Sequence, residues 1–345
     1  MKLTIGVTGL NATDNPGSGV PVIRAIREDK SLNARIIGLS YENMEHGIYL
    51  KNLIDKTYHI PLPSSGSDTL LQRLAYIHSV EKLDIIIPNY DAELPNFIKI
   101  KDQLTDEGIR TYLPDKEIFE ARHKNKLFEF GKKYGIKVPK SKTLFKVNEI
   151  TGLMSEFNFP MVVKGKFYEA YIAYTFEQVH TYYHKLAAKW GLPVIIQEFI
   201  AGNEYDVVAL GDGTGKTIGA IPMKKMVLTD KGKAWAGITI NDKNILSMAY
   251  KLIKATKWKS GMELELMKSE KDELYLIEIN PRFPAWVYLS AGAGQNLPAA
   301  LVKLAMGKKV KPFKKYKTGK MFVRYSMDNV CDIKDFEKIS TLGEY

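Results

Sequence analysis

The sequence contains a single cysteine, Cys331, among 345 residues, so no intrachain disulfide can form. One thiol fits a reducing compartment, and we expect a cytoplasmic protein. No apolar stretch approaches the roughly 20 residues that cross a bilayer. The N-terminal segment from Met1 to Val7 also lacks the long apolar stretch of an export signal. From these absences we expect that the protein does not associate with a membrane.

The chain also lacks the modules that usually accompany nucleic-acid binding. Its net charge is +11, but the lysines are spread along the sequence, with one concentration from Lys303 to Lys320. No set of stacking aromatic residues and no zinc finger goes with them. We therefore expect no nucleic acid as a partner, and a basic face suits an anionic small substrate instead.

The first 115 or so residues alternate short apolar runs with amphipathic stretches, which predicts a parallel sheet wound with helices. A glycine-bearing loop from Gly9 to Gly19 opens a helical stretch, Val20 to Arg27, whose amides could bind an anion. The loop does not have the G-x-G-x-x-G spacing, so NAD binding is not favoured. The expected strands are Leu3 to Thr8, Ala34 to Leu39 and Asp84 to Pro88.

A change of lobe is predicted after a helix from Pro114 to Tyr134, because Gly135 and Pro139 indicate a chain reversal. A second lobe follows, and then a run of strands separated by glycine turns. The second lobe has predicted strands at Met161 to Lys164 and Val194 to Phe199, with a helix from Phe176 to Lys189 between them. The run of strands that follows is predicted at Tyr205 to Leu210, Thr217 to Pro222, Ala236 to Ile240, Met262 to Lys268 and Leu274 to Ile279.

The segment from Leu276 to Phe283 carries the most specific chemistry. Side chains alternate along a strand, so Glu278 and Asn280 point the same way, about 7 Å apart. Pro281 ends the strand ladder, so that Arg282 can turn towards the same pocket, where its planar guanidinium could bind phosphate.

A preceding alternating strand offers Glu263 and Glu265, and a hairpin from Ser269 to Glu273 would place one of them beside Glu278. Two carboxylates and one amide oxygen suit Mg²⁺, which prefers oxygen ligands and keeps positions open for phosphates. The alternation alone is equally typical of a polar hairpin with one exposed face.

Glu265 followed by Glu278-Ile-Asn-Pro-Arg282 resembles the metal-binding signature of the ATP-grasp superfamily, especially the branch of carbamoyl-phosphate synthetase and biotin carboxylase. The resemblance implies an α/β (α+β) chain with an N-terminal Rossmann-like pre-ATP-grasp domain and an ATP-grasp domain that ends in an antiparallel-sheet subdomain. We expect these at residues 1–115 and 116–310, with a lid subdomain at about 137–200 and a C-terminal extension, 311–345, packed on the ATP-grasp domain.

The other parts of the ATP-grasp pattern follow in order. Lys124 precedes Gly135 by eleven residues, as the family's first nucleotide-binding basic residue does, and Lys164 in Pro160-Met-Val-Val-Lys-Gly165 matches the second lysine. The resemblance implies an ATP site at Lys124, Lys164, Glu198, Phe199, Ile200 and Glu204, with Glu204 on the ribose. It implies Mg²⁺, or Mn²⁺ in its place, at Glu265, Glu278 and Asn280, and catalytic roles for Lys164 and Arg282.

One segment departs from the family pattern. Lys164 is followed by Gly165-Lys-Phe-Tyr-Glu-Ala-Tyr171, which has one glycine where the family has a glycine-rich loop over the phosphates. Fewer backbone amides would then reach the terminal phosphate, with Lys166 as a substitute donor or as an ordinary exposed lysine.

The resemblance implies a biosynthetic ligase that activates a carboxylate as an acyl phosphate and couples it to an amine. We expect a small carboxylate and an amine, such as an amino acid or a peptide, as substrates. Bicarbonate activation, as in the biotin-dependent relatives, and a catalytically silent nucleotide-binding protein are the alternatives. Trp286 and Tyr288 could line the acceptor pocket or belong to the core. The hairpin from Lys224 to Ile238 could contact substrate or only solvent. A homodimer is compatible with the sequence.

Overall fold

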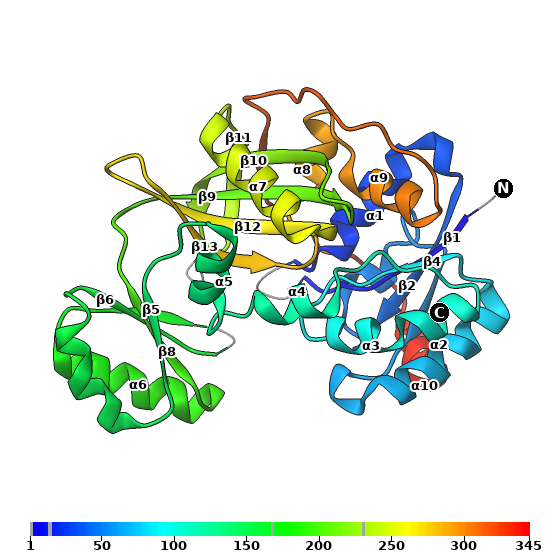
Figure 1. Ribbon diagram of the computed structural model, residues 1–345. Helices are drawn as coiled ribbons and strands as arrows, with labels where there is room; N and C mark the ends of the chain where they lie inside the picture. The colour runs from blue at the N-terminus through cyan, green and yellow to red at the C-terminus, as the bar shows by residue number, and fades with distance from the viewer. Residues whose placement is uncertain (1–2, 13–15, 167–168, 230–231) are drawn as a thin grey trace. The chain divides into compact units, whose positions relative to one another are not determined.

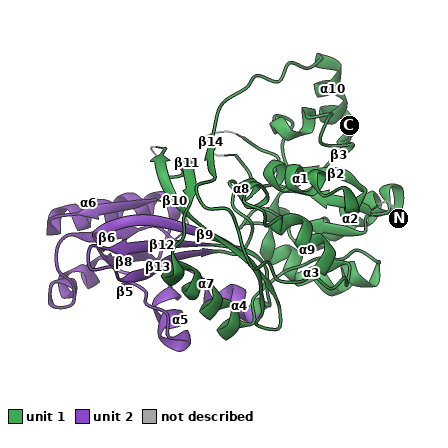
Figure 2. Ribbon diagram, turned by 90° about the horizontal axis from the view of Figure 1, so that it is seen from above, with its two compact units in different colours: residues 1–116, 207–263, 280–345 green, residues 117–206, 264–279 purple. Residues whose placement is uncertain are grey.

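The computed structural model describes residues 3–12, 16–166, 169–229 and 232–345. The chain forms two compact units, coloured separately in Figure 2. Unit 1 comprises residues 1–116, 207–263 and 280–345, and unit 2 comprises residues 117–206 and 264–279. Within the described ranges no helix has both the length and the apolar composition of a membrane span.

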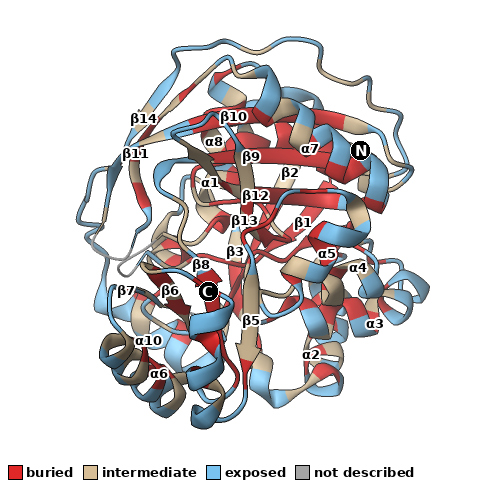
Figure 3. Cartoon of the chain, turned by 60° about the vertical axis from the view of Figure 1, so that its left-hand side comes forward, coloured by how far each residue is buried: buried red, intermediate tan, exposed pale blue. Residues whose placement is uncertain are grey.

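A parallel sheet opens unit 1, in the order β3-β2-β1-β4. Every residue of β1 is buried, as expected of a parallel strand covered on both faces (Figure 3). Three of the strands confirm the sequence prediction, whereas β3 was missed because it has four residues and two of them are only half-buried. The strands are β1 (Leu3–Val7), β2 (Ala34–Ser40), β3 (Lys56–His59) and β4 (Ile85–Ile87).

Helices join the strands of this sheet. The first, α1 (Gly19–Glu28), begins where the Gly19 amide donates to the Gly9 carbonyl at 2.9 Å. A Cβ at Gly19 would lie 2.1 Å from the Thr8 carbonyl oxygen, so this close approach requires glycine. The other connections contain α2 (Ser67–Glu81) and the short 3-10 helices η1 (Lys30–Leu32), η2 (His46–Tyr49) and η3 (Pro63–Ser65), and α3 (Leu94–Asp106) follows β4.

The core of unit 1 extends from this sheet to helices late in the chain. One continuous apolar cluster contains β1 and α1 residues together with Val208, Ile221 and Leu301. Helices α8 (Tyr288–Gly292) and α9 (Leu297–Ala305) both pack against α1. Asn296 fixes this contact, because its Nδ2 donates to the Ala25 carbonyl at 2.7 Å.

The largest sheet has the order β13-β12-β9-β10-β11-β14, and Figure 1 labels its strands β9 to β13. Helix α7 (Lys243–Thr256) packs against β10. The predicted strands of this region are confirmed, and β9, β12 and β13 each contribute residues to both units. The strands are β9 (Gly202–Asp212), β10 (Thr217–Leu228), β11 (Ala234–Thr239), β12 (Lys259–Ser269), β13 (Leu274–Asn280) and β14 (Met321–Val323).

Unit 2 contains a small antiparallel sheet in the order β5-β8-β6-β7. Helix α6 (Phe176–Trp190) covers one face and buries Val179, Tyr183 and Leu186 against it (Figure 1). Its strands are β5 (Ser141–Leu144), β6 (Met161–Lys164), β7 (Ala170–Ala173) and β8 (Val194–Glu198), and the 3-10 helix η4 (Val147–Ser155) packs on α6.

The single helix expected from Pro114 to Tyr134 is wrong, because two helices form, α4 (Lys116–Ala121) and α5 (Leu127–Tyr134). Residues 124–126 are all polar and offer a continuous helix no apolar side chain to bury. The Lys126 amide donates to the His123 carbonyl at 2.7 Å and closes a turn instead. The predicted end at Gly135 is confirmed, with this residue in the left-handed conformation.

Residues after 311 are divided between two sheets of unit 1. Strand β14 pairs with β11, whereas α10 (Ile333–Leu342) packs on β3. The amide of Thr57 donates to the Tyr345 carbonyl at 2.7 Å, and the Tyr345 amide returns a bond of 2.8 Å. The last residues of the chain therefore extend the hydrogen bonding of the parallel sheet.

Candidate active site

Unit 2 gathers five charged side chains of the predicted site: Lys124, Lys164, Glu204, Glu265 and Glu278. We call them the lysine–glutamate cluster. Lys124 lies in the turn between α4 and α5, and its Nζ is 2.9 Å from Glu278 Oε2. Each of these two side chains is 25% exposed, so the ion pair borders solvent.

Lys164, the last residue of β6, is the electrostatic centre of this cluster. Burial lowers its pKa to about 8, and the positive charge of Lys124 adds to the effect. Glu278, Glu265 and Glu204 act in the opposite direction but do not restore the ordinary value. An anion bound beside Lys164 would favour the charged form of this lysine.

The β12–β13 hairpin brings Glu265 and Glu278 towards Lys164. The predicted turn from Ser269 to Glu273 is confirmed, with the Ser269 amide 2.9 Å from the Glu273 carbonyl. The two strands are hydrogen-bonded neighbours, and both glutamates are half-buried. The structure thus places two of the three predicted metal ligands around one lysine.

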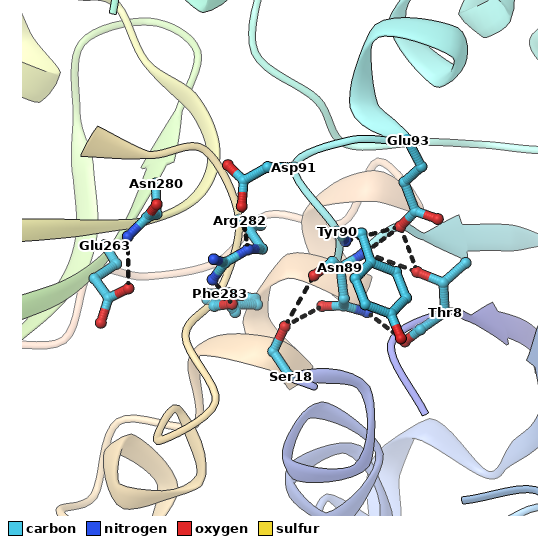
Figure 4. A network of polar contacts seen from close by, with 10 residues as sticks. All are labelled: Thr8, Ser18, Asn89, Tyr90, Asp91, Glu93, Glu263, Asn280, Arg282 and Phe283. Atoms are coloured by element: carbon cyan, nitrogen blue, oxygen red, sulfur yellow. Dashed lines mark hydrogen bonds and ion pairs between the residues drawn. The ribbon is translucent and has the colours of Figure 1, made fainter. Parts of the chain in front are cut away.

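The third predicted ligand, Asn280, is buried in unit 1 and contacts Glu263. Asn280 Nδ2 donates to Glu263 Oε2 at 2.9 Å (Figure 4). The other carboxylate oxygen of Glu263 accepts a hydrogen bond of 2.6 Å from Trp286 Nε1. The sequence left open whether Glu263 or Glu265 accompanies Glu278, and the structure gives the two residues different surroundings.

Arg282 follows β13 and binds an aspartate that the sequence analysis missed. Its Nε is 2.7 Å from Asp91 Oδ2, and its Nη1 donates to the Phe283 carbonyl at 3.2 Å (Figure 4). Asp91 lies just beyond the carboxyl end of β4, an edge where ligand-binding residues of parallel sheets gather, so its position was the available signal. The guanidinium is therefore held in place by a carboxylate.

The predicted adenine segment ends β8 and leads into β9. Glu198 is exposed, while Phe199 and Ile200 are half-buried. The Glu198 amide donates to the Lys140 carbonyl at 2.8 Å, and its side chain accepts from the Lys140 amide at 3.2 Å. Glu204 lies exposed on β9 and contributes to the field at Lys164.

The segment after Lys164 connects the antiparallel strands β6 and β7. The Gly165 amide donates to the Glu169 carbonyl at 3.1 Å, and Lys166 is exposed. Phe167 and Tyr168 of the predicted phosphate loop lie outside the described residues, as do residues 13–15 of the N-terminal loop and 230–231 of the Lys224 to Ile238 hairpin.

The two aromatic residues considered for an acceptor pocket have other contacts. Trp286 is 5% exposed and donates to Glu263, so it belongs to the buried side of the site. The Tyr288 ring lies 4.0 Å from the Arg24 guanidinium carbon, and its hydroxyl bonds to Glu28 on α1. These contacts within the described part of the chain leave both residues engaged with protein groups.

A second polar network occupies the carboxyl edge of the parallel sheet (Figure 4). Glu93 Oε1 accepts hydrogen bonds from the Thr8 hydroxyl at 2.5 Å and from the amides of Asn89 and Tyr90 at 2.7 and 2.9 Å. Tyr41 donates to the other carboxylate oxygen. This buried carboxylate fixes the loops beside Arg282's partner, Asp91.

Comparison with known proteins agrees with this architecture. Residues 192–327 match the family model described as ATP-grasp in the biosynthetic pathway with Ter operon. The carbamoyl phosphate synthase large chain of Clostridium beijerinckii is 25% identical over 272 residues, covering 74% of this chain and 24% of that protein. The chain thus spans about a quarter of the length of the curated relatives it matches.

Two solved structures show the similarity of the fold. The biotin carboxylase domain of Hydrogenobacter thermophilus 2-oxoglutarate carboxylase, in complex with MgADP, ADP and bicarbonate, has a TM-score of 0.70 at 18% identity, covering 95% of this chain and 72% of that chain. Phosphoribosylglycinamide synthetase from Anaerococcus prevotii has a TM-score of 0.66 at 17% identity, covering 93% and 80%.

These proteins share the succession found here, a parallel N-terminal sheet, a small antiparallel sheet and a larger antiparallel sheet. The resemblance of the motif residues to the ATP-grasp superfamily implied the same order of parts. The chain therefore has the ATP-grasp fold, and its sequence is similar to ATP-grasp proteins of the branch of carbamoyl phosphate synthase and biotin carboxylase.

Proposed function

We propose that this protein is an ATP-dependent ligase that activates a carboxylate as an acyl phosphate and joins it to an amine, releasing ADP and phosphate. The observation that carries the proposal is the lysine–glutamate cluster, in which two lysines and three glutamates meet in one unit. Two cations offset phosphate charge, and carboxylates of neighbouring strands provide oxygen ligands for a divalent ion.

ATP would bind with its phosphates at Lys124 and Lys164. The adenine would contact the main chain of Glu198 to Ile200, and Glu204 would accept from the ribose hydroxyls. The exposure of Glu204 and the half-buried state of Phe199 and Ile200 support this placement, because a ligand can reach them. The low pKa of Lys164 supports it as well, since phosphate binding would favour the lysine's charged form.

The donor chemistry also fits magnesium. Glu265 and Glu278 offer carboxylate oxygens, and Asn280, two residues beyond Glu278 in β13, offers an amide oxygen on the same strand face. Mg²⁺, or Mn²⁺ in its place, would neutralise charge on the terminal phosphates. Lys124, which pairs with Glu278 here, would be a neighbour of those same phosphates.

The reaction proceeds in two displacements. An oxygen of the substrate carboxylate attacks the γ-phosphorus, the bond to the β,γ-bridging oxygen breaks, and ADP leaves. The amine then attacks the acyl carbon, loses a proton and expels inorganic phosphate, so that an amide remains. Lys124, Lys164 and Arg282 would stabilise the developing negative charge, and positioning replaces a covalent nucleophile.

Bicarbonate is the second candidate for the activated carboxylate. The support is the similarity to a biotin carboxylase domain whose structure contains bicarbonate and MgADP. A silent nucleotide-binding protein is the third, and its support is the single glycine in the segment after Lys164. The three differ in what stimulates ATP cleavage.

The test is to incubate the protein with Mg-ATP and pools of amino acids and peptides, and to measure release of phosphate and ADP. Stimulation by a pair of pools, with formation of an amide detected by mass spectrometry, is the expected result. Dependence on bicarbonate alone would favour carboxylation. Absence of cleavage with every pool, despite ADP binding, would favour the silent protein.

A further inference from the structure

Glu263 is a buried carboxylate that accepts hydrogen bonds from two N–H donors. It lies on β12, is 7% exposed, and accepts from Asn280 at 2.9 Å and from Trp286 at 2.6 Å. Both donors are themselves buried. Burying a carboxylate is costly unless its charge is compensated, so this arrangement calls for a role beyond filling space.

An ionised carboxylate can only accept hydrogen bonds, and this property fixes the orientation of the Asn280 amide. The atom of Asn280 that faces Glu263 must be its nitrogen, so Oδ1, the other terminal atom of the amide, points away from Glu263. The chemistry therefore sets which end of Asn280 is presented to a ligand, since the reverse orientation would put two oxygens in contact.

Trp286 fixes the orientation of the Glu263 carboxylate. Trp286 Nε1 holds Oε1, which prevents the carboxylate from rotating away from Asn280.

We propose that Glu263 is the positioning residue for Asn280, holding its amide oxygen towards the divalent cation, and that Glu263 is not itself a metal ligand. This inference rests on the proposed function, because it assumes that Asn280 binds the ion. Outer partners of this kind fix the orientation of metal ligands in many proteins. The proposal also gives Trp286 a function, as the second anchor of the carboxylate.

The test is a titration of Mn²⁺ into protein saturated with ADP, with free Mn²⁺ measured by electron paramagnetic resonance. Glu263→Gln presents an NH₂ group that can turn the Asn280 amide over. We expect Mn²⁺ affinity to fall about 10- to 100-fold, while ADP affinity without metal is unchanged. The double variant Glu263→Gln/Asn280→Asp reverses the pair, because the introduced aspartate accepts from the introduced glutamine and still offers an oxygen to the metal. It should recover most of the loss.

Equal Mn²⁺ affinity of Glu263→Gln and the wild type would overturn the inference, and so would a double variant that binds no better than the single one. A merely structural carboxylate would lower the unfolding temperature of Glu263→Gln without such a rescue. If that variant does not fold, Glu263→Asp withdraws the carboxylate by one methylene and must also weaken Mn²⁺ binding. Failure of the wild type to bind Mn²⁺ with ADP would instead refute the proposed function.

Discussion

Replacing Lys164 with methionine should stabilise the nucleotide-free protein while abolishing its use of ATP. The folded protein holds this lysine at a pKa of about 8, against an ordinary value of 10.5, chiefly because of burial. This difference in pKa lowers the free energy of unfolding by at most about 3 kcal/mol at neutral pH. Because the pKa is lowered in the folded protein, the destabilisation is complete below pH 8 and disappears as the pH rises to 10.5. Lys164→Met removes the charge and therefore the destabilisation.

The assay is urea unfolding of the wild type and Lys164→Met at several pH values from about 7 to 10. The stability difference should be largest near neutral pH, up to about 3 kcal/mol, and should shrink as the solution becomes alkaline. Lys271→Met, at an exposed position of the β12–β13 hairpin, is the matched control and should show no such pH trend. A Lys164→Met variant that is less stable than the wild type at neutral pH would refute the reasoning.

Three further predictions concern other charged groups. Burial raises the pKa of Glu45 to about 7 from 4.5, so the stabilisation by its protonated form is complete below pH 4.5 and lost as the pH rises to 7. In urea unfolding, the wild type should lose up to about 3 kcal/mol of unfolding free energy over this pH range, and Glu45→Gln should not. Glu278→Gln removes a carboxylate ligand and the partner of Lys124, and phosphate release should fall on the order of 100-fold at an unchanged unfolding temperature; full activity would contradict the metal site. Asp91→Asn weakens the 2.7 Å pair with Arg282 and should cost about 1–3 kcal/mol of unfolding free energy; an unchanged urea midpoint would show that the pair does not stabilise the fold.

The fold was largely predictable because most of its strands are apolar runs of clear length. β6 matches its prediction residue for residue, and β1, β2 and β8 differ by one residue or less at their ends. Among the strands that were missed, β5 and β7 are four residues long and mostly half-buried or exposed. Their identity as strands comes from pairing with β8 and β6, which local sequence does not encode.

The site was predictable where its residues are close in sequence. Glu278 and Asn280 share one strand, and the turn before them places Glu265 in the same hairpin. Alternation puts Glu263 and Glu265 on the same strand face, so only tertiary contacts distinguish the carboxylate beside Lys164 from the one beside Asn280. Asp91 lies 191 residues from Arg282, and no local pattern joins them.

A crystal structure of the protein with ADP and Mg²⁺ tests the central claim most directly. We predict the nucleotide's phosphates at Lys124 and Lys164, its ribose at Glu204, and the ion on Glu265, Glu278 and Asn280. A nucleotide bound instead at the loop between β1 and α1, with these side chains far from the ion, would contradict the account.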